Sequence, residues 1–335
     1  MTSTDPQSWL AIVFMALMGL SMLIYAILDG YDLGVGTLLL GGNDEEKDIM
    51  IGSIGPFWDA NETWLVLGVG ILLVAFPLAH GVILTNLYMP VTVMIIGLIL
   101  RGVAFDFRVK AQDRLKPFWN KAFFVGSLVT AISQGYMLGS YILGFEMSLT
   151  AFAFSMLVGL CVAAAYVLVG SCWLIMKTED DLQAKAILWA QYSLRMATVG
   201  IILVSISTPL VSDRIFDKWF DFPNILLLMP IPIITAALVF ALEVILHRLP
   251  KPEDKWSWVP FVCVIGIFIL CFHGLAYSFY PYIVPDSLTI YEAASSVSSL
   301  KIILVGVIIV LPILFAYTML VYRIFSGKAS HLTYN

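Results

Sequence analysis

The sequence predicts an all-α integral membrane protein with about nine transmembrane helices and almost no soluble domain. Of its 335 residues, 60% are hydrophobic and only 12% are charged, against about 25% charged in a typical soluble domain. The mean hydropathy is +0.94. Long apolar runs recur along the chain, and about 20 apolar residues in a helix are enough to span a bilayer.

The apolar runs define nine approximate helices in a single membrane domain that covers residues 1–335. They are 9–29, 60–79, 81–104, 119–142, 149–176, 193–212, 222–247, 257–280 and 300–325. The second and third predicted helices meet at a tight turn around Pro77 and His80, so they form a hairpin. The longest connection runs from Gly30 to Asn61 and is rich in acidic residues.

The positive charges predict the orientation. If the N-terminus lies outside, 15 of the 18 Lys and Arg residues fall in cytoplasmic loops, and only Arg214, Lys218 and Lys301 fall outside. Cytoplasmic loops of membrane proteins carry such an excess, so we expect an outer N-terminus and a cytoplasmic C-terminus. The net charge of −5 and the lack of a basic stripe exclude nucleic acid as an expected partner.

The first polar cluster is YAILDGYDLGVG, residues 25–36. Asp29 and Asp32 are three residues apart, so they share one face of a helix. Three glycines follow at a spacing typical of close helix packing: Gly30, Gly34 and Gly36. The cluster is either a proton-accessible carboxylate pair at the end of the first helix or a solvated turn. Aspartate at a helix C-terminus opposes the helix dipole, which weakens the second interpretation.

The second polar cluster is GPFWDANETW, residues 55–64. Asp59 and Glu62 are three residues apart, near the positive end of the second predicted helix. Carboxylates there suit the helix dipole and need no further role. The alternative is a proton-uptake mouth flanked by Trp58 and Trp64 at the membrane interface. The spacing alone does not decide between the two.

The third polar cluster is RGVAFDFRVKAQDR, residues 101–114. A positively charged cytoplasmic loop explains most of its charges, and Asp106 lies among them. Arg101 is deeper, at the end of an uninterrupted apolar run. An ionisable group in lipid is costly and needs a partner, so we expect Arg101 to pair with a buried carboxylate such as Asp29 or Asp59.

Histidines that could ligate haem are scarce. The four are His80, His247, His273 and His331, and only His273 lies in the middle of a predicted helix. Haem held by two axial histidines inside the membrane needs two that are well placed. We therefore expect this chain to ligate no haem iron and no other metal.

Ordered motifs between Tyr25 and Lys110 resemble subunit II of the cytochrome bd-type quinol oxidases. They are LDGYDLGVG, NDEEKDIMIGSIGPFWDANETWLV, FPLAH and LILRGVAFDFRVK. Residues 126–139 and 280–318 resemble the fourth helix and the last loop and helix of that family, whereas 150–260 match mainly in hydropathy. The WDANETW and RGVAFDFR motifs together are the specific part of the resemblance.

The resemblance implies two four-helix bundles plus one peripheral helix, in a bacterial inner (cytoplasmic) membrane. It also implies a heterodimer with a haem-bearing subunit I, often with a small single-helix third subunit. Subunit I holds two b-type haems and one haem d, oxidises quinol, and reduces oxygen to water with cytoplasmic protons in the respiratory chain. Subunit II ligates no haem but supports assembly and proton uptake and, in some members, oxygen access or quinone binding.

The family's acidic positions map onto residues of this chain. The aspartate of its W-D-x-N pattern, implicated in the proton route, corresponds to Asp59. Phe57 stands where some members carry histidine, so no role of that histidine is carried over. The expected proton pathway comprises Asp59, Asp29, Asp32, Asp106 and Glu62.

A proton-coupled transporter and a purely structural membrane scaffold are the alternatives. A transporter often carries charges near the bilayer midplane, between matched broken helices, whereas these charges lie at cytoplasmic helix ends. A purely structural scaffold would give Asp29 and Asp59 no functional role. The oxidase subunit therefore fits the pattern best.

Overall fold

Helices make up nearly all of the structure, a computed structural model that describes residues 6–329. In chain order the elements are α1 (Pro6–Leu38), η1 (Leu39–Gly41), α2 (Asp44–Ile54), α3 (Trp58–Ala75), α4 (Pro77–Lys110), α5 (Lys116–Ile142), α6 (Leu149–Lys177), α7 (Asp180–Val211), α8 (Asp213–Phe220), α9 (Asn224–Leu228), α10 (Pro230–Leu246), η2 (Pro252–Asp254), α11 (Val259–Phe279), β1 (Tyr282–Val284), β2 (Leu288–Thr289), α12 (Ile290–Ala293) and α13 (Val297–Ile324). Within residues 6–329, nine helices are long and apolar enough to cross a membrane. His331 lies outside the described residues.

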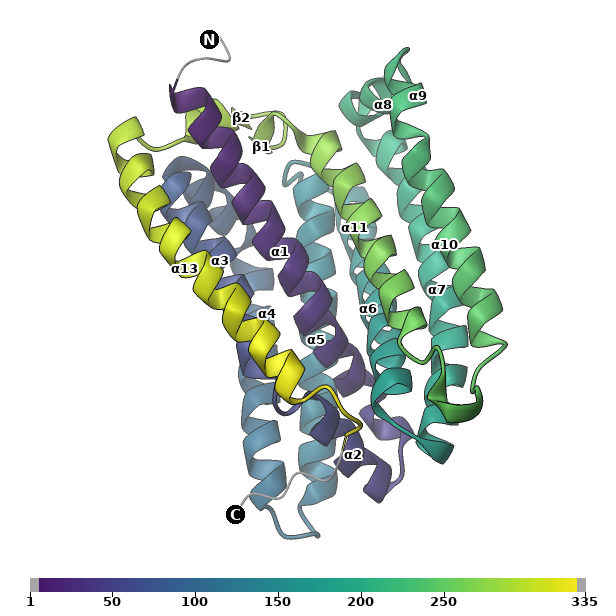
Figure 1. Ribbon diagram of the computed structural model, residues 1–335. Helices are drawn as coiled ribbons and strands as arrows, with labels where there is room; N and C mark the ends of the chain where they lie inside the picture. Colours follow the sequence, from purple (N-terminus) through teal and green to yellow (C-terminus); the bar gives the residue numbers. More distant parts are fainter. Residues whose placement is uncertain (1–5, 330–335) are drawn as a thin grey trace.

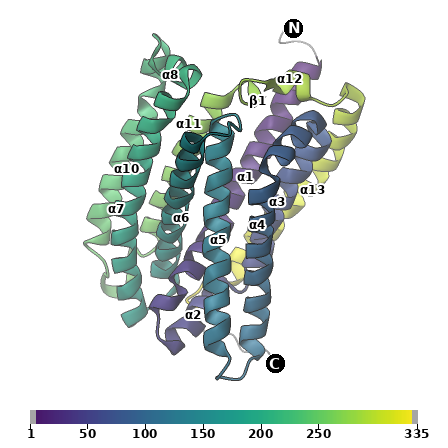
Figure 2. The same ribbon diagram turned by 180° about the vertical axis from the view of Figure 1, so that it is seen from behind.

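The long helices form two four-helix bundles and one peripheral helix, as the resemblance implies (Figures 1 and 2). Helices α1, α3, α4 and α5 make the first bundle, and α6, α7, α10 and α11 make the second. Helix α6 packs on both α1 and α5 and joins the two bundles. Helix α13 lies outside the first bundle, against α1 and α3.

The two ends of the molecule differ in what they carry. One end holds the start of α1, the short helices α8 and α9, and an antiparallel hairpin of β1 and β2 (Figure 1). The other end, the α2 end, holds α2, the α4–α5, α6–α7 and α10–α11 connections, and the C-terminal segment. The loops rich in Lys and Arg therefore lie together at the α2 end.

The first helix is longer than predicted. The sequence prediction ended it at residue 29, whereas α1 continues to Leu38. Asp29 and Asp32 therefore lie inside the helix, fully buried, and not at its C-terminus. The predicted connection to Asn61 also contains α2, which begins with a capping box between Asn43 and Glu46.

The glycines of α1 explain the extension, because they allow neighbouring helices to pack directly on the backbone. A Cβ atom added at Gly34 would lie 1.8 Å from the carbonyl oxygen of Tyr166 in α6, and one at Gly36 would lie 2.1 Å from Oγ of Ser127 in α5. At Gly30 it would meet the Tyr166 ring at 2.8 Å. Tertiary packing here outweighs the low intrinsic helix propensity of glycine.

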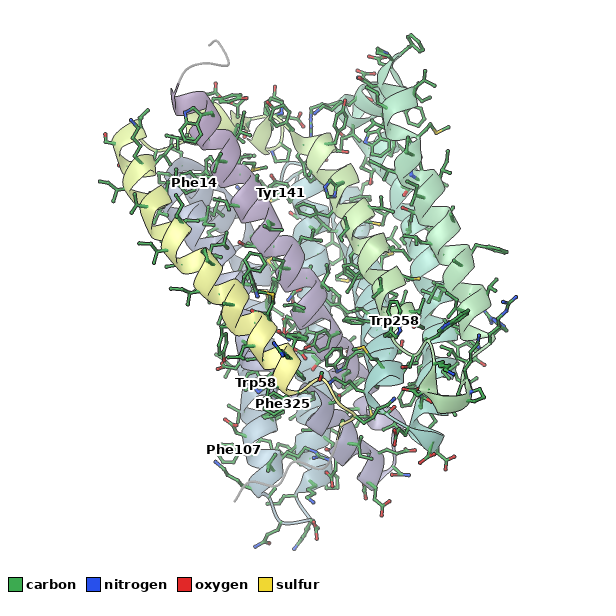
Figure 3. All side chains as sticks on the ribbon, in the orientation of Figure 1. Phe14, Trp58, Phe107, Tyr141, Trp258 and Phe325 are labelled. Carbon is green, nitrogen blue, oxygen red and sulfur yellow. The ribbon has the colours of Figure 1, made fainter. Side chains whose placement is uncertain are left out.

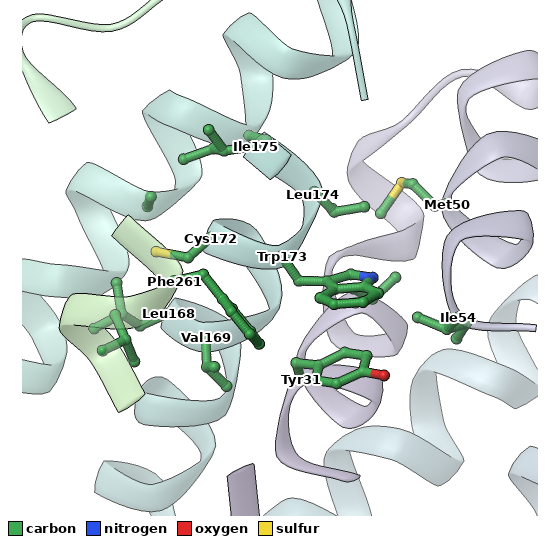
Figure 4. Close-up of a cluster of buried hydrophobic side chains, with 14 of the residues drawn as sticks. Tyr31, Met50, Ile54, Leu168, Val169, Cys172, Trp173, Leu174, Ile175 and Phe261 are labelled. Atoms are coloured by element: carbon green, nitrogen blue, oxygen red, sulfur yellow. The ribbon is translucent and has the colours of Figure 1, made fainter. Parts of the chain in front are cut away.

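An aromatic core fills the space between the bundles near the α2 end (Figure 4). Tyr31 of α1 stacks on Trp173 of α6, with ring centroids 4.2 Å apart, and Phe261 of α11 packs on both rings. The Trp173 indole donates a hydrogen bond to the backbone carbonyl of Ser53 in α2. This core fixes α1 and α2 against the second bundle.

Candidate functional site

A buried ion pair lies at the centre of the polar residues. Nη1 of Arg101 in α4 is 2.7 Å from Oδ1 of Asp29 in α1, and each side chain is 1% exposed. Nη2 of Arg101 is 3.6 Å from Oε1 of the half-buried Glu62 in α3, and the guanidinium lies 5.8 Å from the Trp58 ring centroid. The prediction of a buried carboxylate partner for Arg101 is confirmed, and that partner is Asp29.

Asp32 belongs to a second polar network beside the ion pair. Nδ2 of Asn61 donates to Oδ2 of Asp32 at 2.8 Å and to the Tyr31 hydroxyl at 2.9 Å. The hydroxyl of Tyr322, from the distant helix α13, donates to Oδ1 of Asn61 at 3.1 Å and lies 2.6 Å from the Tyr31 hydroxyl. Four polar side chains from α1, α3 and α13 therefore meet in the interior.

Three residues of this network were not predicted from the sequence to be part of the site: Asn61, Tyr31 and Tyr322. Asn61 lies between Asp59 and Glu62 in the WDANETW motif, and an amide inside such a motif was the available signal. Tyr322 carries no local signal, because it lies in the last turn of an apolar helix, 261 residues after its partner Asn61.

A further polar chain extends from the ion pair toward the second bundle. Tyr25 lies one helical turn before Asp29 on α1. Nε2 of Gln134 in α5 donates to the Tyr25 hydroxyl at 2.6 Å, and the Tyr166 hydroxyl of α6 donates to Oε1 of Gln134 at 2.7 Å. The buried groups around Asp29 are thus connected across three helices.

Asp59 and Asp106 lie outside the buried cluster. Asp59 is exposed in the first turn of α3, one turn before Glu62. It can face the cluster from the surface but is not the partner of Arg101. Asp106 is exposed and five residues beyond Arg101 on α4, which places it on another face of that helix. Asp106 therefore lies apart from the buried cluster, and its part in the proton pathway stays a prediction.

The two tryptophans of the WDANETW motif differ in burial. Trp58 is partly buried against Arg101 and Phe105 near the α2 end (Figure 3). Trp64 is 1% exposed and packs edge-on against Phe315 of α13 at 5.0 Å. Trp64 therefore makes a contact between helices, almost two turns into α3.

Helix α2 is fastened across this end by two ion pairs that the sequence analysis did not anticipate. Nη1 of the buried Arg108 is 2.8 Å from Oδ1 of Asp48, and Nζ of Lys185 in α7 is 2.7 Å from Oε1 of Glu46. Arg108 also donates from Nε to Oδ1 of Asn120. Arg108 lies seven residues after Arg101, two helical turns further along the same face, and this spacing could have predicted that Arg108 is buried as well.

The electrostatics of Glu46 follow from this arrangement. Burial raises the pKa of Glu46, but hydrogen bonds from Lys185 and from the Asn43 backbone outweigh that effect and hold the pKa below its usual range. Glu46 is therefore ionised at neutral pH and keeps α2 attached to α7. Across residues 6–329, no three His, Cys, Asp or Glu side chains come together in a group that could hold a metal ion.

The fold and the site together define a multi-pass helical membrane protein of two bundles with a buried carboxylate–arginine cluster at one end. The chain belongs to the family of cytochrome bd terminal oxidase subunit II, whose model matches residues 10–325. The resemblance found in the motifs is confirmed. The chain is thus one subunit of an oxidoreductase complex, and its place as subunit II implies a partner subunit I.

Characterised relatives cover nearly the full chain. The chain is 28% identical to cytochrome bd ubiquinol oxidase subunit 2 of Bacillus subtilis (strain 168), over 92% of this chain and 93% of that protein. It is 26% identical to cytochrome bd-I ubiquinol oxidase subunit 2 of Escherichia coli (strain K12), over 92% of each. The structure of bd oxidase from Geobacillus thermodenitrificans shares the fold, with a TM-score of 0.74 at 17% identity, over 94% of this chain and 98% of that one.

Proposed function

We propose that this chain is the haem-free subunit II of a bacterial quinol oxidase that passes electrons from quinol to oxygen. Its partner would be a subunit I that holds two b-type haems and haem d, with room for a small third subunit. Support comes from the relatives in B. subtilis and E. coli, which are named as subunits of ubiquinol oxidases. A transporter or a scaffold has no comparable support.

We further propose that the chain delivers protons from the cytoplasm to the partner subunit. The observation that carries this proposal is a series of acids of increasing burial: Asp59 is exposed, Glu62 is half-buried, and Asp29 is fully buried. Arg101 contacts both Glu62 and Asp29, so a negative charge can be stabilised at either position. Such a series can collect a proton at the surface and release it inside.

The proposed orientation places the α2 end in the cytoplasm. The basic loops gather at that end, as the distribution of positive charge in membrane proteins requires. Asp59 then opens to the side from which the protons of oxygen reduction are drawn. The N-terminus lies on the outer side of the bacterial inner membrane.

Asp59→Asn in the complete oxidase tests the proton-entry proposal. The substitution keeps the size of the side chain but removes its exchangeable charge, so we expect quinol-driven oxygen consumption to fall about a hundredfold, at the lower end of the range typical of lost proton-transfer groups. Haem content and subunit yield should stay at wild-type values. Asp44→Asn, which changes a carboxylate that is 93% exposed on α2, is the matched control. Wild-type turnover in Asp59→Asn would refute proton entry at this residue.

A further inference from the structure

The peripheral helix α13 contributes a polar group to the interior through Tyr322. Most of α13 is an exposed apolar surface. Near its end, however, the Tyr322 hydroxyl donates to Oδ1 of Asn61 at 3.1 Å, and Asn61 in turn donates to Asp32 at 2.8 Å. The bonds to Asp32 thus depend on a helix outside the bundle that holds Asp32.

The segment that follows α13 is fastened to the second bundle. Nζ of Lys177, at the end of α6, donates to the carbonyl oxygens of Phe325 and Gly327, the latter at 2.9 Å. The backbone N–H of Ala329 donates to the Lys177 carbonyl at 2.8 Å. Nζ of Lys328 donates to the Thr178 carbonyl at 2.9 Å. We call residues 325–329 with Lys177 the tail clamp.

The chemistry of Lys177 suits this role. Its side chain is buried, and Nζ lies 5.3 Å from the Phe57 ring centroid and 5.1 Å from that of Trp173. A cation at the C-terminal end of a helix binds carbonyl groups that lack partners and complements the negative end of the dipole. Lys177 therefore caps α13 from a different bundle, which fixes the rotation of α13 as well as its position.

The direction of the hydrogen bonds shows what Tyr322 does. The asparagine amide has an acceptor oxygen and a donor nitrogen that differ little in shape. The Tyr322 hydroxyl donates to Oδ1 and Nδ2 donates to Oδ2 of Asp32, so both ends of the amide have a partner in this orientation. Apolar packing of α13, as between Phe315 and Trp64, could not select this orientation.

We infer that Tyr322 is a positioning residue that orients the Asn61 amide toward Asp32, and that the tail clamp holds Tyr322 in place. The inference rests on the proposed function together with the expectation from the sequence that Asp32 belongs to the proton pathway. It assigns the C-terminal segment of the chain a part in the buried site of the first bundle.

A double-mutant cycle in the complete oxidase tests this inference. The four forms are the wild type, Tyr322→Phe, Asn61→Ala and the double variant, with Tyr317→Phe as the matched control because Tyr317 is exposed on the same helix. We expect Tyr322→Phe to lower oxygen consumption about three- to tenfold with unchanged haem content. In the Asn61→Ala background it should have no further effect, because residues that act through one contact are not additive.

Two results would overturn the inference: wild-type turnover in Tyr322→Phe, or losses that multiply in the double variant. If Asn61→Ala does not assemble, Asn61→Leu replaces it, since it fills more of the same space and also removes the amide that Tyr322 contacts. Asp59→Asn separates the two proposals. Reduced turnover in Asp59→Asn with a wild-type Tyr322→Phe rejects only the positioning role, and the reverse result rejects only proton entry.

Lys177→Met tests the clamp independently, with Lys110→Met at the exposed end of α4 as its control. We expect Lys177→Met to lower turnover about two- to fivefold, and adding Tyr322→Phe to it should lower turnover less than in the wild type. Full turnover in Lys177→Met would overturn the role of the clamp.

Discussion

Each of the two four-helix bundles contains an arginine–carboxylate pair between two of its helices, and the two pairs differ in burial. In the first bundle, Arg101 and Asp29 are 2.7 Å apart and each is 1% exposed. In the second bundle, Arg195 of α7 and Glu243 of α10 are 2.9 Å apart and are 56% and 32% exposed. The contact distances are nearly equal, so the surroundings decide what each pair does.

In an exposed pair, water can solvate each charge nearly as well as the partner does, and such pairs stabilise proteins by about 0.2–1 kcal/mol. A buried pair is different, because neither charge can be left alone without a large desolvation cost. The first bundle therefore has a site in which protonating one group changes the energy of its neighbours. The second bundle has no equivalent among its described ion pairs.

The largest expected effect comes from Arg101→Ala. The substitution leaves Asp29 buried without its cationic partner, which costs about 3–5 kcal/mol when one member of a buried pair is removed. We expect strongly reduced yield of the assembled oxidase and a lower midpoint of thermal unfolding. Arg195→Ala, which removes the exposed arginine, is the control and should change the stability by less than about 1 kcal/mol. Equal effects of the two substitutions would break the contrast between the bundles.

Gly34→Ala should have the next largest effect, because the buried pair depends on the tight packing of α1. The added Cβ would lie 1.8 Å from the Tyr166 backbone oxygen, and a backbone cannot move aside as a side chain can. We expect a loss of about 2–3 kcal/mol, in the range of overpacked cores, measured by thermal unfolding of the complex. Gly19→Ala, on the same helix, meets only the ring edge of Phe272 at 3.0 Å and should be nearly neutral. A neutral Gly34→Ala would show that α1 and α6 can separate at low cost.

The helices of this protein could be predicted from sequence because lipid imposes a simple rule on apolar length. The ends of the first helix could not. Asp29, Gly30, Asp32 and Gly34 have the composition of a turn, and they remain helical because α5 and α6 pack on them. The residues that pack there, such as Ser127 and Tyr166, lie about ninety or more positions further along the chain, and the glycine spacing indicated close packing without showing that the helix continues.

The site could be predicted where one residue would be energetically costly in the membrane without a partner. Arg101 at the end of an apolar run required a partner, which pointed to Asp29 or Asp59. Asp106 was placed in the proton pathway by the family resemblance, and five positions on a helix turn its side chain to another face than that of Arg101. Tyr322 and Lys177 could not be found, because each satisfies a partner from a distant helix and neither is out of place locally.

The smallest expected effect concerns a third pair, which is intermediate in burial. Glu46 is 8% exposed and its partner Lys185 is 42% exposed, so we expect Glu46→Gln to lower stability by about 1 kcal/mol at neutral pH. The pKa of Glu46 is lowered in the folded protein, which means that folding favours its ionised form. Its contribution is therefore complete above the unfolded pKa of about 4.5 and is lost as the pH falls through the lower folded value.

The gap in thermal midpoint between wild type and Glu46→Gln measures this contribution. It should be constant from pH 7 to about pH 5 and should shrink below about pH 4.5. Glu45→Gln, one position earlier and exposed on α2, is the control and should show no such gap. A gap that widened on acidification would mean that folding favours the protonated form of Glu46, and the pair would then resemble neither the buried nor the exposed one. A gap that narrows as described places the Glu46–Lys185 pair between the buried Arg101–Asp29 pair and the exposed Arg195–Glu243 pair. Partial burial strengthens the Glu46–Lys185 pair, but neither charge depends wholly on the other.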